Sequence, residues 1–450
     1  MSPHEWLRAG ALGAILTGDV IADAGALAKR ILFGNIAERE WGGARRLVLL
    51  TGGMKYLELW GRDSVAALPA LPAVHREVWR NTLEAFIDHQ RPDGLFPRKV
   101  AGFGNAERNL RSIFTQRGIS LPVSLSLTPE YRTAGYAGRS RLLKRLANKI
   151  FFGTAGEPKD INPLILLSIA EYARDEPAFL VRHEAAVRNA LAYLDRHTRE
   201  GLLWQYDHED WLDVYGRQGH VLYTNVLYFA SLRALAGEFR HRDRRIAAEL
   251  ARKARGVRER LQEFWDEDRA HFISHRDESG THRQFATDGN MLAILTNLAN
   301  ARQRHGILGN LERIVDDYGY VPIVEPSYPA SLQSGMRRVF LWKYREGRLL
   351  KPWLQVLAAK AAAGERPDLA ARLLAQVARV FVDHGCCEVI NGNTGKPHEF
   401  LLTRTEKRFT AAAALFLSAV AGGSGTAARR CRLLPITTGS PNTRSPELHP

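Results

Sequence analysis

The sequence predicts an all-α fold, a single toroid of helical hairpins. Apolar residues recur at three- and four-residue steps in segments throughout the chain, which is the pattern of helices with one buried face. Strand-like alternation is confined to two short stretches, residues 271–276 and 386–391. Short polar turns separate the helical segments, and no fixed-period repeat indicates a solenoid. Paired helices that close into one ring account best for this pattern.

The helical segments extend from about residue 18 to about residue 420. Asp63 and Asp160 stand directly before apolar runs, where N-cap residues are expected, and Gly364 and Gly385 close two other runs. The clearest periodic segments are residues 183–197, 225–239, 250–265, 351–365, 367–384 and 408–421.

We expect one large domain over residues 30–421, with an N-terminal segment, 1–29, and a C-terminal tail, 422–450. The tail is rich in Gly, Ser, Thr and Pro, which predicts disorder. Residues 100–150 are rich in Gly and Arg with weak periodicity, and we expect them to form an excursion that covers a pocket as a lid. Near the N-terminus Gly18 and Asp19 interrupt a short apolar run, which argues against a signal peptide.

Composition excludes several classes of protein. The 450 residues are 45% hydrophobic and 25% charged, which is typical of a globular protein, and the net charge is +15. The basic residues lie in separate runs mixed with acids, as on solvated helix faces, and no nucleic-acid-binding motif is present. No segment has the length of a membrane span. Three cysteines without metal or disulfide spacing favour a reducing, cytoplasmic location. We therefore expect no nucleic-acid partner and no membrane partner.

The familiar signatures of cofactor and metal enzymes are missing from the sequence. No phosphate-binding loop, dinucleotide fingerprint, nucleophile elbow or H-E-x-x-H motif occurs. The fifteen histidines are scattered along the chain. We expect no cofactor.

A cluster of acids and tryptophans points to carbohydrate chemistry. The stretch "WQYDHEDWLDVYGRQGH" packs two indoles and several carboxylates into a few residues before a predicted helix. An indole offers a flat apolar surface to a sugar ring, and a carboxyl desolvated against it has a raised pKa, as a general acid requires. A solvated acidic loop is the alternative explanation. The residues concerned are Trp204, Asp207, Glu209, Asp210, Trp211 and Asp213.

Three further stretches place polar groups at helix ends. "ELWGRDSVAALPAL" sets Trp60, Arg62 and Asp63 before an apolar helix, although Asp63 alone would be explained as an N-cap. Asp288 in "RQFATDGNMLAIL" has the same alternative. Glu388 follows the helix that Gly385 closes and precedes the turn in "CCEVINGNTGKP".

The order of these motifs resembles the (α/α)6-barrel glycoside hydrolases, which include the amylo-α-1,6-glucosidases and the family 63 enzymes. "WGRDSVAALPAL" is similar to their W-G-R-D-[ST] motif, and "QRPDGLFPR" to the Q-x-x-D-G-x-x-P element that follows it. "KDINPLILLSIAEY" resembles their D-x-[TS]-P-L helix, with Asn162 in place of Ser or Thr. "DWLD", "GHVLYTNVLYFASL", "FATDGNMLAI", "GRLLKPWLQVLAAKA" and "EVINGNTGKP" follow in the family order. The resemblance covers residues 30 to 420.

The resemblance implies roles for residues of this chain. Asp213, the last residue of "DWLD", would be the general acid, with Asp210 as the second candidate, and Glu388 would be the general base that activates water. The clan inverts the anomeric configuration, which implies a separation of about 6.5–9.5 Å between the two carboxyls. No metal is implied for the reaction. The implied substrate-binding residues are Trp60, Arg62, Asp63, Trp204, Asp210, Trp211, Asp288 and Trp353.

The prediction is therefore an inverting, exo-acting glycoside hydrolase that releases a terminal α-linked sugar, with glucose as the first candidate. Two hypotheses remain beside it. An epimerase or lyase on the same fold would centre its pocket on histidines such as His208, His220 or His384. A catalytically silent protein would bind a glycan without turning it over. From the sequence alone, we also expect an Arg62→Ala variant to fold normally and to bind substrate weakly.

Overall fold

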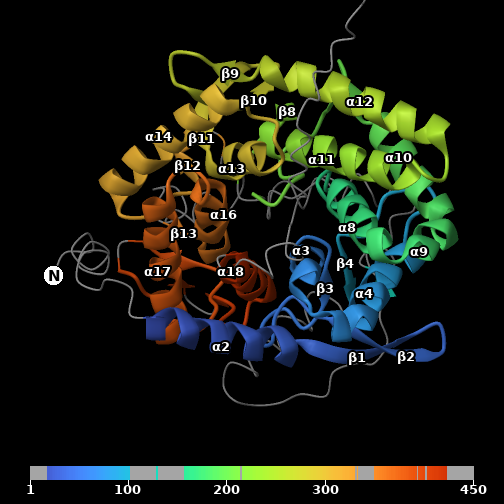
Figure 1. Ribbon diagram of the computed structural model, residues 1–450, viewed down its shortest axis with the longest axis horizontal. Helices are drawn as coiled ribbons and strands as arrows, with labels where there is room; N and C mark the ends of the chain where they lie inside the picture. Colours follow the sequence, from blue (N-terminus) through green and yellow to red (C-terminus); the bar gives the residue numbers. More distant parts are fainter. Residues whose placement is uncertain are drawn as a thin grey trace, which may run out of the picture.

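The computed structural model describes residues 18–101, 128–129, 157–212, 215–329, 332, 349–392, 394–400 and 403–422. Most of the predicted excursion at 100–150 and residues 423–450 of the predicted tail lie outside these ranges. The helices form a ring, with an inner and an outer layer around a central axis (Figure 1).

Six helices of the described chain form the inner layer. They follow one another around the ring in chain order, each contacts the next, and the last returns to the first (Figure 1). Nearly every residue of α11 and α13 is buried, because an inner helix has neighbours on both sides and an outer helix behind it. The inner helices are α3 (Asp63–Ala67), α8 (Ile161–Asp175), α11 (Leu222–Phe239), α13 (Thr287–Leu295), α16 (Pro352–Ala362) and α18 (Thr410–Gly422).

The outer helices bury only one face. In α12 the buried residues are Ala247, Leu250, Ala254, Val257 and Leu261, which recur at three- and four-residue steps, while arginines occupy the exposed face. This is the periodicity that the sequence displays, and it confirms the predicted pairing of helices. The outer helices are α2 (Gly18–Gly34), α4 (Arg76–Asp88), α9 (Pro177–Arg182), α10 (Glu184–Asp195), α12 (Arg244–Gln262), α14 (Ala301–Tyr318) and α17 (Pro367–His384).

The prediction of a purely α fold needs correction, because short strands connect the helices. The largest sheet pairs β12 (Val324–Glu325), β11 (Gly280–Ala286), β10 (His271–Asp277) and β8 (His220–Val221), and β9 (Trp265–Asp266) pairs with β10. The stretch 271–276 was predicted as a strand, and it lies in β10. The remaining strands are β1 (Ile36–Trp41), β2 (Ala44–Leu49), β3 (Leu59–Trp60), β4 (Lys99–Ala101), β5 (Thr128–Pro129), β6 (Thr198–Arg199), β7 (Leu202–Leu203), β13 (Leu349–Leu350), β14 (Ile390–Asn391), β15 (Glu399–Phe400) and β16 (Thr403–Arg404).

The β1–β2 hairpin was missed, although its turn is visible in the sequence. Gly42 and Gly43 both have positive φ, 61° and 74°, which is the backbone of the two-residue turn that joins twisted antiparallel strands. Charged residues occur on both faces of this hairpin, Glu38 and Glu40 on one and Arg39 on the other, so the alternation of apolar and polar residues is weak in the sequence.

Buried amide side chains attach the inner helices to the segments that precede them. The Asn290 amide on α13 accepts the backbone N–H of Phe272 at 3.0 Å and donates to the Phe272 carbonyl at 3.0 Å. Asn225 on α11 makes the same pair of bonds to Leu203, at 2.7 and 3.1 Å, and Gln355 on α16 makes them to Val321, at 3.0 and 2.6 Å.

Asn162 on α8 completes the set with a small variation. It accepts the Phe96 N–H at 2.9 Å and donates to the Gly94 carbonyl at 3.0 Å. All four amides, Asn162, Asn225, Asn290 and Gln355, are fully buried. Because each one satisfies a donor and an acceptor of a buried strand or loop, they fix the connecting segments at the N-terminal ends of these helices.

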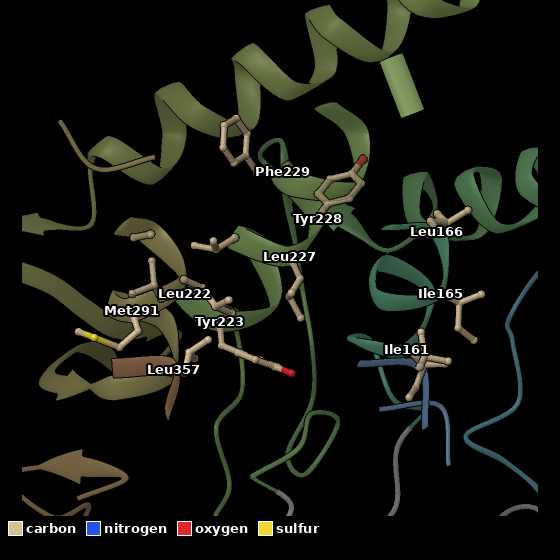
Figure 2. Close-up of a cluster of buried hydrophobic side chains, with 14 of the residues drawn as sticks. Ile161, Ile165, Leu166, Leu222, Tyr223, Leu227, Tyr228, Phe229, Met291 and Leu357 are labelled. Atoms are coloured by element: carbon tan, nitrogen blue, oxygen red, sulfur yellow. The ribbon is translucent and has the colours of Figure 1, made fainter. Parts of the chain in front are cut away.

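The main core cluster contains residues of all six inner helices, and a second cluster lies between α2, α16, α17 and α18. Figure 2 shows buried side chains of α8, α11, α13 and α16 from the main cluster, including Ile165, Leu227, Met291 and Leu357. Within the described residues, no helix combines the length and the apolar character needed to cross a bilayer.

The ring closes where the two ends of the described chain meet. The N–H of Thr410, the first residue of α18, donates to the carbonyl of Thr51 at 3.0 Å, and the Asn35 amide donates to the Thr410 hydroxyl at 2.8 Å. Helix α2 packs against α17 and α18. The domain boundary expected between residues 29 and 30 falls within α2.

Replacing Asn290 by leucine should lower the free energy of unfolding by about 3 kcal/mol. Leucine has a similar size but no hydrogen-bonding group, so the buried Phe272 N–H and carbonyl lose their partner. Urea and thermal midpoints measure the loss. Asn189→Leu on the exposed face of α10 is the matched control and should change stability by less than about 0.5 kcal/mol. Equal losses in both variants would contradict the role given to the buried amide.

Candidate active site

Glu388 lies a few residues beyond the end of α17, in the segment that leads to β14. Its backbone N–H donates to the Glu406 carbonyl at 2.8 Å, which fixes the start of the segment. Its carboxylate accepts a hydrogen bond from the Tyr56 hydroxyl at 3.1 Å and forms an ion pair with the Lys351 ammonium at 3.2 Å. Residues from three distant parts of the chain therefore meet at this carboxylate.

The cations around Glu388 keep it ionised. Burial alone would raise its pKa, but the charges of Lys351 and Lys55 and the hydrogen bonds from Lys351 and Tyr56 outweigh burial, so the pKa of Glu388 lies below its usual range. A carboxylate held in the charged form can accept a proton from water.

Asp63 is the opposite case. It is the first residue of α3, the N-cap position belongs to Arg62, and no side-chain capping bond is formed. The N-cap explanation for Asp63 is therefore wrong. Burial, together with the negative charge of Glu388, raises the pKa of Asp63 to about 7, against the opposing charges of Arg62 and Lys351. Two carboxyls whose pKa values are pushed apart, as here, are typical of acid–base sites.

Arg62 forms a bidentate ion pair with a buried carboxylate. Its Nε and one terminal nitrogen donate to the two Asp160 oxygens at 2.6 and 3.0 Å. Asp160 is fully buried and occupies the N-cap position of α8, but it makes no side-chain capping bond. Asp160, which was predicted as an N-cap, instead holds Arg62 in place through this ion pair. Both residues act electrostatically on Asp63.

Trp60 forms an aromatic wall next to Glu388. Its ring lies 5.9 Å from that of Tyr56, edge to face, and Tyr56 bonds Glu388. The indole N–H donates to Glu58 at 2.9 Å, and Glu58 is in turn paired with the buried Lys99 at 3.4 Å. The fixed, half-buried indole leaves part of its surface exposed.

A second cluster is built around the buried guanidinium of Arg217. It is 2.9 Å from an Asp210 oxygen and 3.1 Å from an Asp288 oxygen. Asp288 also accepts the Trp211 indole N–H at 2.6 Å, and Trp211 packs edge to face on Trp353 at 4.9 Å. Both aspartates are almost completely buried. Their oxygens are therefore engaged within the protein, whereas the two indoles are half-exposed.

The two clusters meet at Tyr223 on α11. Burial and the nearby carboxylates of Asp160, Asp288 and Asp210 raise the pKa of Tyr223 well above its ordinary value, against the charge of Arg62. Lys351, which pairs with Glu388, lies two residues before Trp353. The structure thus brings together Trp60, Arg62, Asp63, Asp210, Trp211, Asp288, Trp353 and Glu388 at the N-terminal ends of the inner helices.

Trp204 is not part of this group. Its ring lies 4.2 Å from the Arg199 guanidinium and 5.0 Å from the His220 ring. It lines a separate hollow of about 390 Å³, together with Arg260 of α12 and Glu263, which follows that helix. Asp213, the predicted general acid, lies outside the described residues.

Sequence reasoning missed the residues that hold the site together. Glu406 is fully buried, and one of its oxygens accepts the backbone N–H groups of Met54, Lys55 and Tyr56. It thereby fixes the turn that delivers Tyr56 to Glu388. A glutamate in the ordinary stretch "LTRTEKRF" gives no signal of this role.

Comparison with solved structures supports the architecture at low sequence identity. A rhamnosidase from Klebsiella oxytoca, solved with rhamnose bound, matches with a TM-score of 0.60 and 13% identity over 91% of this chain and 65% of its own. The GH63 mannosylglycerate hydrolase from Thermus thermophilus, in complex with Tris and D-glycerate, matches with a TM-score of 0.58 and 15% identity over 88% and 99% of the two chains.

The chain has the (α/α)6 toroid fold of these glycoside hydrolases. A GH78 rhamnosidase of Bacillus sp. GL1 has the same likeness, with a TM-score of 0.55 and 15% identity over 89% of this chain and 34% of that chain. This chain covers slightly less than two thirds of the Klebsiella rhamnosidase and about one third of the Bacillus enzyme. No protein-family model and no curated protein matches the sequence.

The Arg62–Asp160 pair changes the expectation for Arg62→Ala. Removing the cation leaves a fully buried carboxylate without its partner, which should cost about 3–5 kcal/mol. Burial already raises the pKa of Asp160 despite Arg62. Because the charged form of Asp160 is the destabilised one, the variant should lose more stability as the pH rises than wild type does. Urea midpoints at pH 5 and pH 8 measure this effect.

The double variant Arg62→Ala/Asp160→Asn is the control, because it removes the buried charge along with its partner. It should recover most of the lost stability and remove the added pH dependence. If Arg62→Ala alone unfolds at the wild-type midpoint at both pH values, the ion pair does not stabilise the toroid.

Proposed function

We propose that this chain is an inverting, exo-acting glycoside hydrolase that releases a terminal α-linked sugar from a small glycoside or oligosaccharide. One observation carries the proposal. An ionised Glu388 lies near the protonatable Asp63 and the indole of Trp60, at the N-terminal ends of the inner helices of an (α/α)6 toroid. Solved toroids of similar fold include rhamnosidases and a mannosylglycerate hydrolase.

In the proposed reaction Glu388 removes a proton from the attacking water and Asp213 protonates the leaving oxygen. The low pKa of Glu388 supports the first role, since the base must be ionised before it can act. Inversion requires the water to attack from the face opposite the leaving group, which sets the two carboxyls about 6.5–9.5 Å apart.

The remaining residues are proposed to bind and orient the sugar. Asp63 is not the N-cap of α3, and its carboxyl lies among the charges of Glu388, Arg62 and Lys351, so it suits a sugar hydroxyl. Trp60, Trp211 and Trp353 offer indole surfaces. Asp210 and Asp288 are proposed to act through Arg217 and Trp211, because their own oxygens are already bonded.

The first alternative, an epimerase or lyase, has a specific observation against it. Around Glu388, the hydrogen bonds and ion pairs of the described residues involve no histidine, which disfavours an epimerase or lyase that uses imidazole as its acid–base group. His220 lies instead beside Trp204, outside the group that contains Glu388. A protein that binds a glycan without turnover remains a possible outcome of the experiment below.

The acid and base roles are tested by Asp213→Asn and Glu388→Gln. Each should lower kcat/KM on the wild-type substrate by about 100- to 10,000-fold, because each removes a proton-transfer group. The substrate panel comprises α-glucosides, α-rhamnosides, mannosylglycerate and glucosylglycerate, with the anomer of the first product read by NMR. A β-anomer released from an α-linked substrate demonstrates inversion.

A dinitrophenyl glycoside separates the two roles, because its leaving group needs no protonation. Asp213→Asn should retain more activity on it than on a disaccharide, and Glu388→Gln should not. Asp268→Asn and Glu259→Gln, both at exposed positions, are the matched controls. Full activity in both site variants would overturn the assignment, and sugar binding without turnover by wild type would favour the silent binder.

Lys351→Met should move the acidic limb of the kcat/KM profile to higher pH. The Lys351 ammonium helps to hold the pKa of Glu388 below its usual range, so its removal raises that pKa, and the base becomes protonated at a higher pH. Lys29→Met, exposed on α2, is the control and should leave the profile unchanged. An acidic midpoint that stays fixed or falls in Lys351→Met would show that Glu388 is not the group that titrates.

A further inference from the structure

The hairpin of β10 and β11 carries three potential metal ligands on one face. His275 on β10 is paired directly with His282 on β11, and Asp277 follows His275 by two residues, so its side chain points to the same side of the sheet. The potential ligand atoms of the three residues all lie within 4.8 Å of one another. This group lies outside the proposed sugar site, and the proposed reaction does not use it.

His275 has the environment of a ligating histidine. It is fully buried, its Nδ1 lies 3.0 Å from the Ser274 hydroxyl, and that hydroxyl is in turn bonded to the Tyr328 hydroxyl. Its Nε2 is buried without a hydrogen-bond partner. A histidine that binds metal through one nitrogen is oriented by a hydrogen bond at the other. A buried ring nitrogen without a partner otherwise costs stability.

Asp277 and His282 are already placed as neighbouring ligands. One Asp277 oxygen holds the hairpin turn by accepting the Ser279 N–H at 2.8 Å, and the other lies 3.2 Å from His282 Nε2. Ligand atoms at about 2.0–2.2 Å from zinc in a tetrahedron are about 3.3–3.6 Å apart, so this pair, 3.2 Å apart, is close to the required separation. The His275 and His282 rings are stacked 3.9 Å apart and nearly parallel. The partly exposed His282 ring therefore has to turn to share a metal with His275 Nε2.

The local charge suits a divalent cation. Arg217 is the arginine that acts on His275 electrostatically, and Asp210 and Asp288 both contact it. One arginine and these two aspartates leave one negative charge, and Asp277 adds a second. A divalent ion would bring the sum of these four groups and the metal to zero.

We propose that His275, Asp277 and His282 bind a divalent transition metal, with Zn²⁺ as the first candidate and water as the fourth ligand. Two imidazoles and one carboxylate suit zinc and its neighbours in the first transition series, and they do not suit the oxygen-preferring Mg²⁺ or Ca²⁺. The metal would fasten the β10–β11 hairpin beside the Arg217 network.

The test uses full-length protein without an affinity tag, treated with EDTA and dialysed, and it requires no substrate. Addition of Co²⁺ should produce the visible absorption of a tetrahedral site at one ion per chain, and Zn²⁺ should abolish that absorption and raise the Tm. His282→Ala should weaken Zn²⁺ binding by at least about 100-fold, since loss of a residue that merely orients a ligand already costs about 10- to 100-fold.

Two further variants keep the result interpretable. Asp277→Asn retains the oxygen that holds the turn and should also weaken binding, whereas His305→Ala, exposed on α14, should bind as wild type does. Equal Zn²⁺ affinity in wild type and His282→Ala, or no binding at millimolar metal, would overturn the proposal. In that case the group would have only a structural role, with the His275 and His282 rings stacked and His282 bonded to Asp277. Neither outcome bears on the hydrolase proposal, because no turnover is measured.

Discussion

Closure of the ring is the constraint on which the candidate site depends. Helix α18 packs against α3, and beside this seam Glu406 accepts the N–H groups of residues 54–56, which helps to set Tyr56 against Glu388, 332 positions away in the chain. A toroid left open at this seam would keep most of its helical core. It would lose the partner of its proposed base. The catalytic arrangement is therefore a property of the closed ring rather than of any single hairpin.

Closure also explains why so many charged groups gather at one end. Asp63 starts α3, Asp160 precedes α8 and Asp288 lies in the first turn of α13, so carboxylates meet the positive ends of inner helices, which offsets part of the cost of burying their charges. Lys351 is the exception, because a cation before α16 is disfavoured by the helix dipole. Its ion pair with Glu388 offsets that cost, and the same pair lowers the pKa of the proposed base. Structure and proposed chemistry thus rest on one contact.

The sequence predicted the helices well, because their apolar periodicity is a local property. The structure brings Trp60, Asp63 and Glu388 together, whereas Trp204, which the sequence analysis grouped with Asp210, lies elsewhere. The chain is extended at that point and alternates sides, so Gln205 reaches Asp210 while Trp204 turns toward Arg199. The Arg62–Asp160 pair joins residues 98 positions apart, and no local pattern encodes such a partner.

The buried amides show why the repeat within the toroid escaped a search of the sequence. Asn162, Asn225, Asn290 and Gln355 do the same work in successive units, and their residue numbers differ by 63, 65 and 65. The regular spacing is that of one outer helix, one connection and one inner helix. Only one polar side chain per unit is held constant, however, and the last is Gln rather than Asn. The surrounding core requires only apolar side chains of suitable volume, so the units need not share a sequence around their amides. What repeats in this protein is a pair of hydrogen bonds, and hydrogen bonds are visible only in the structure.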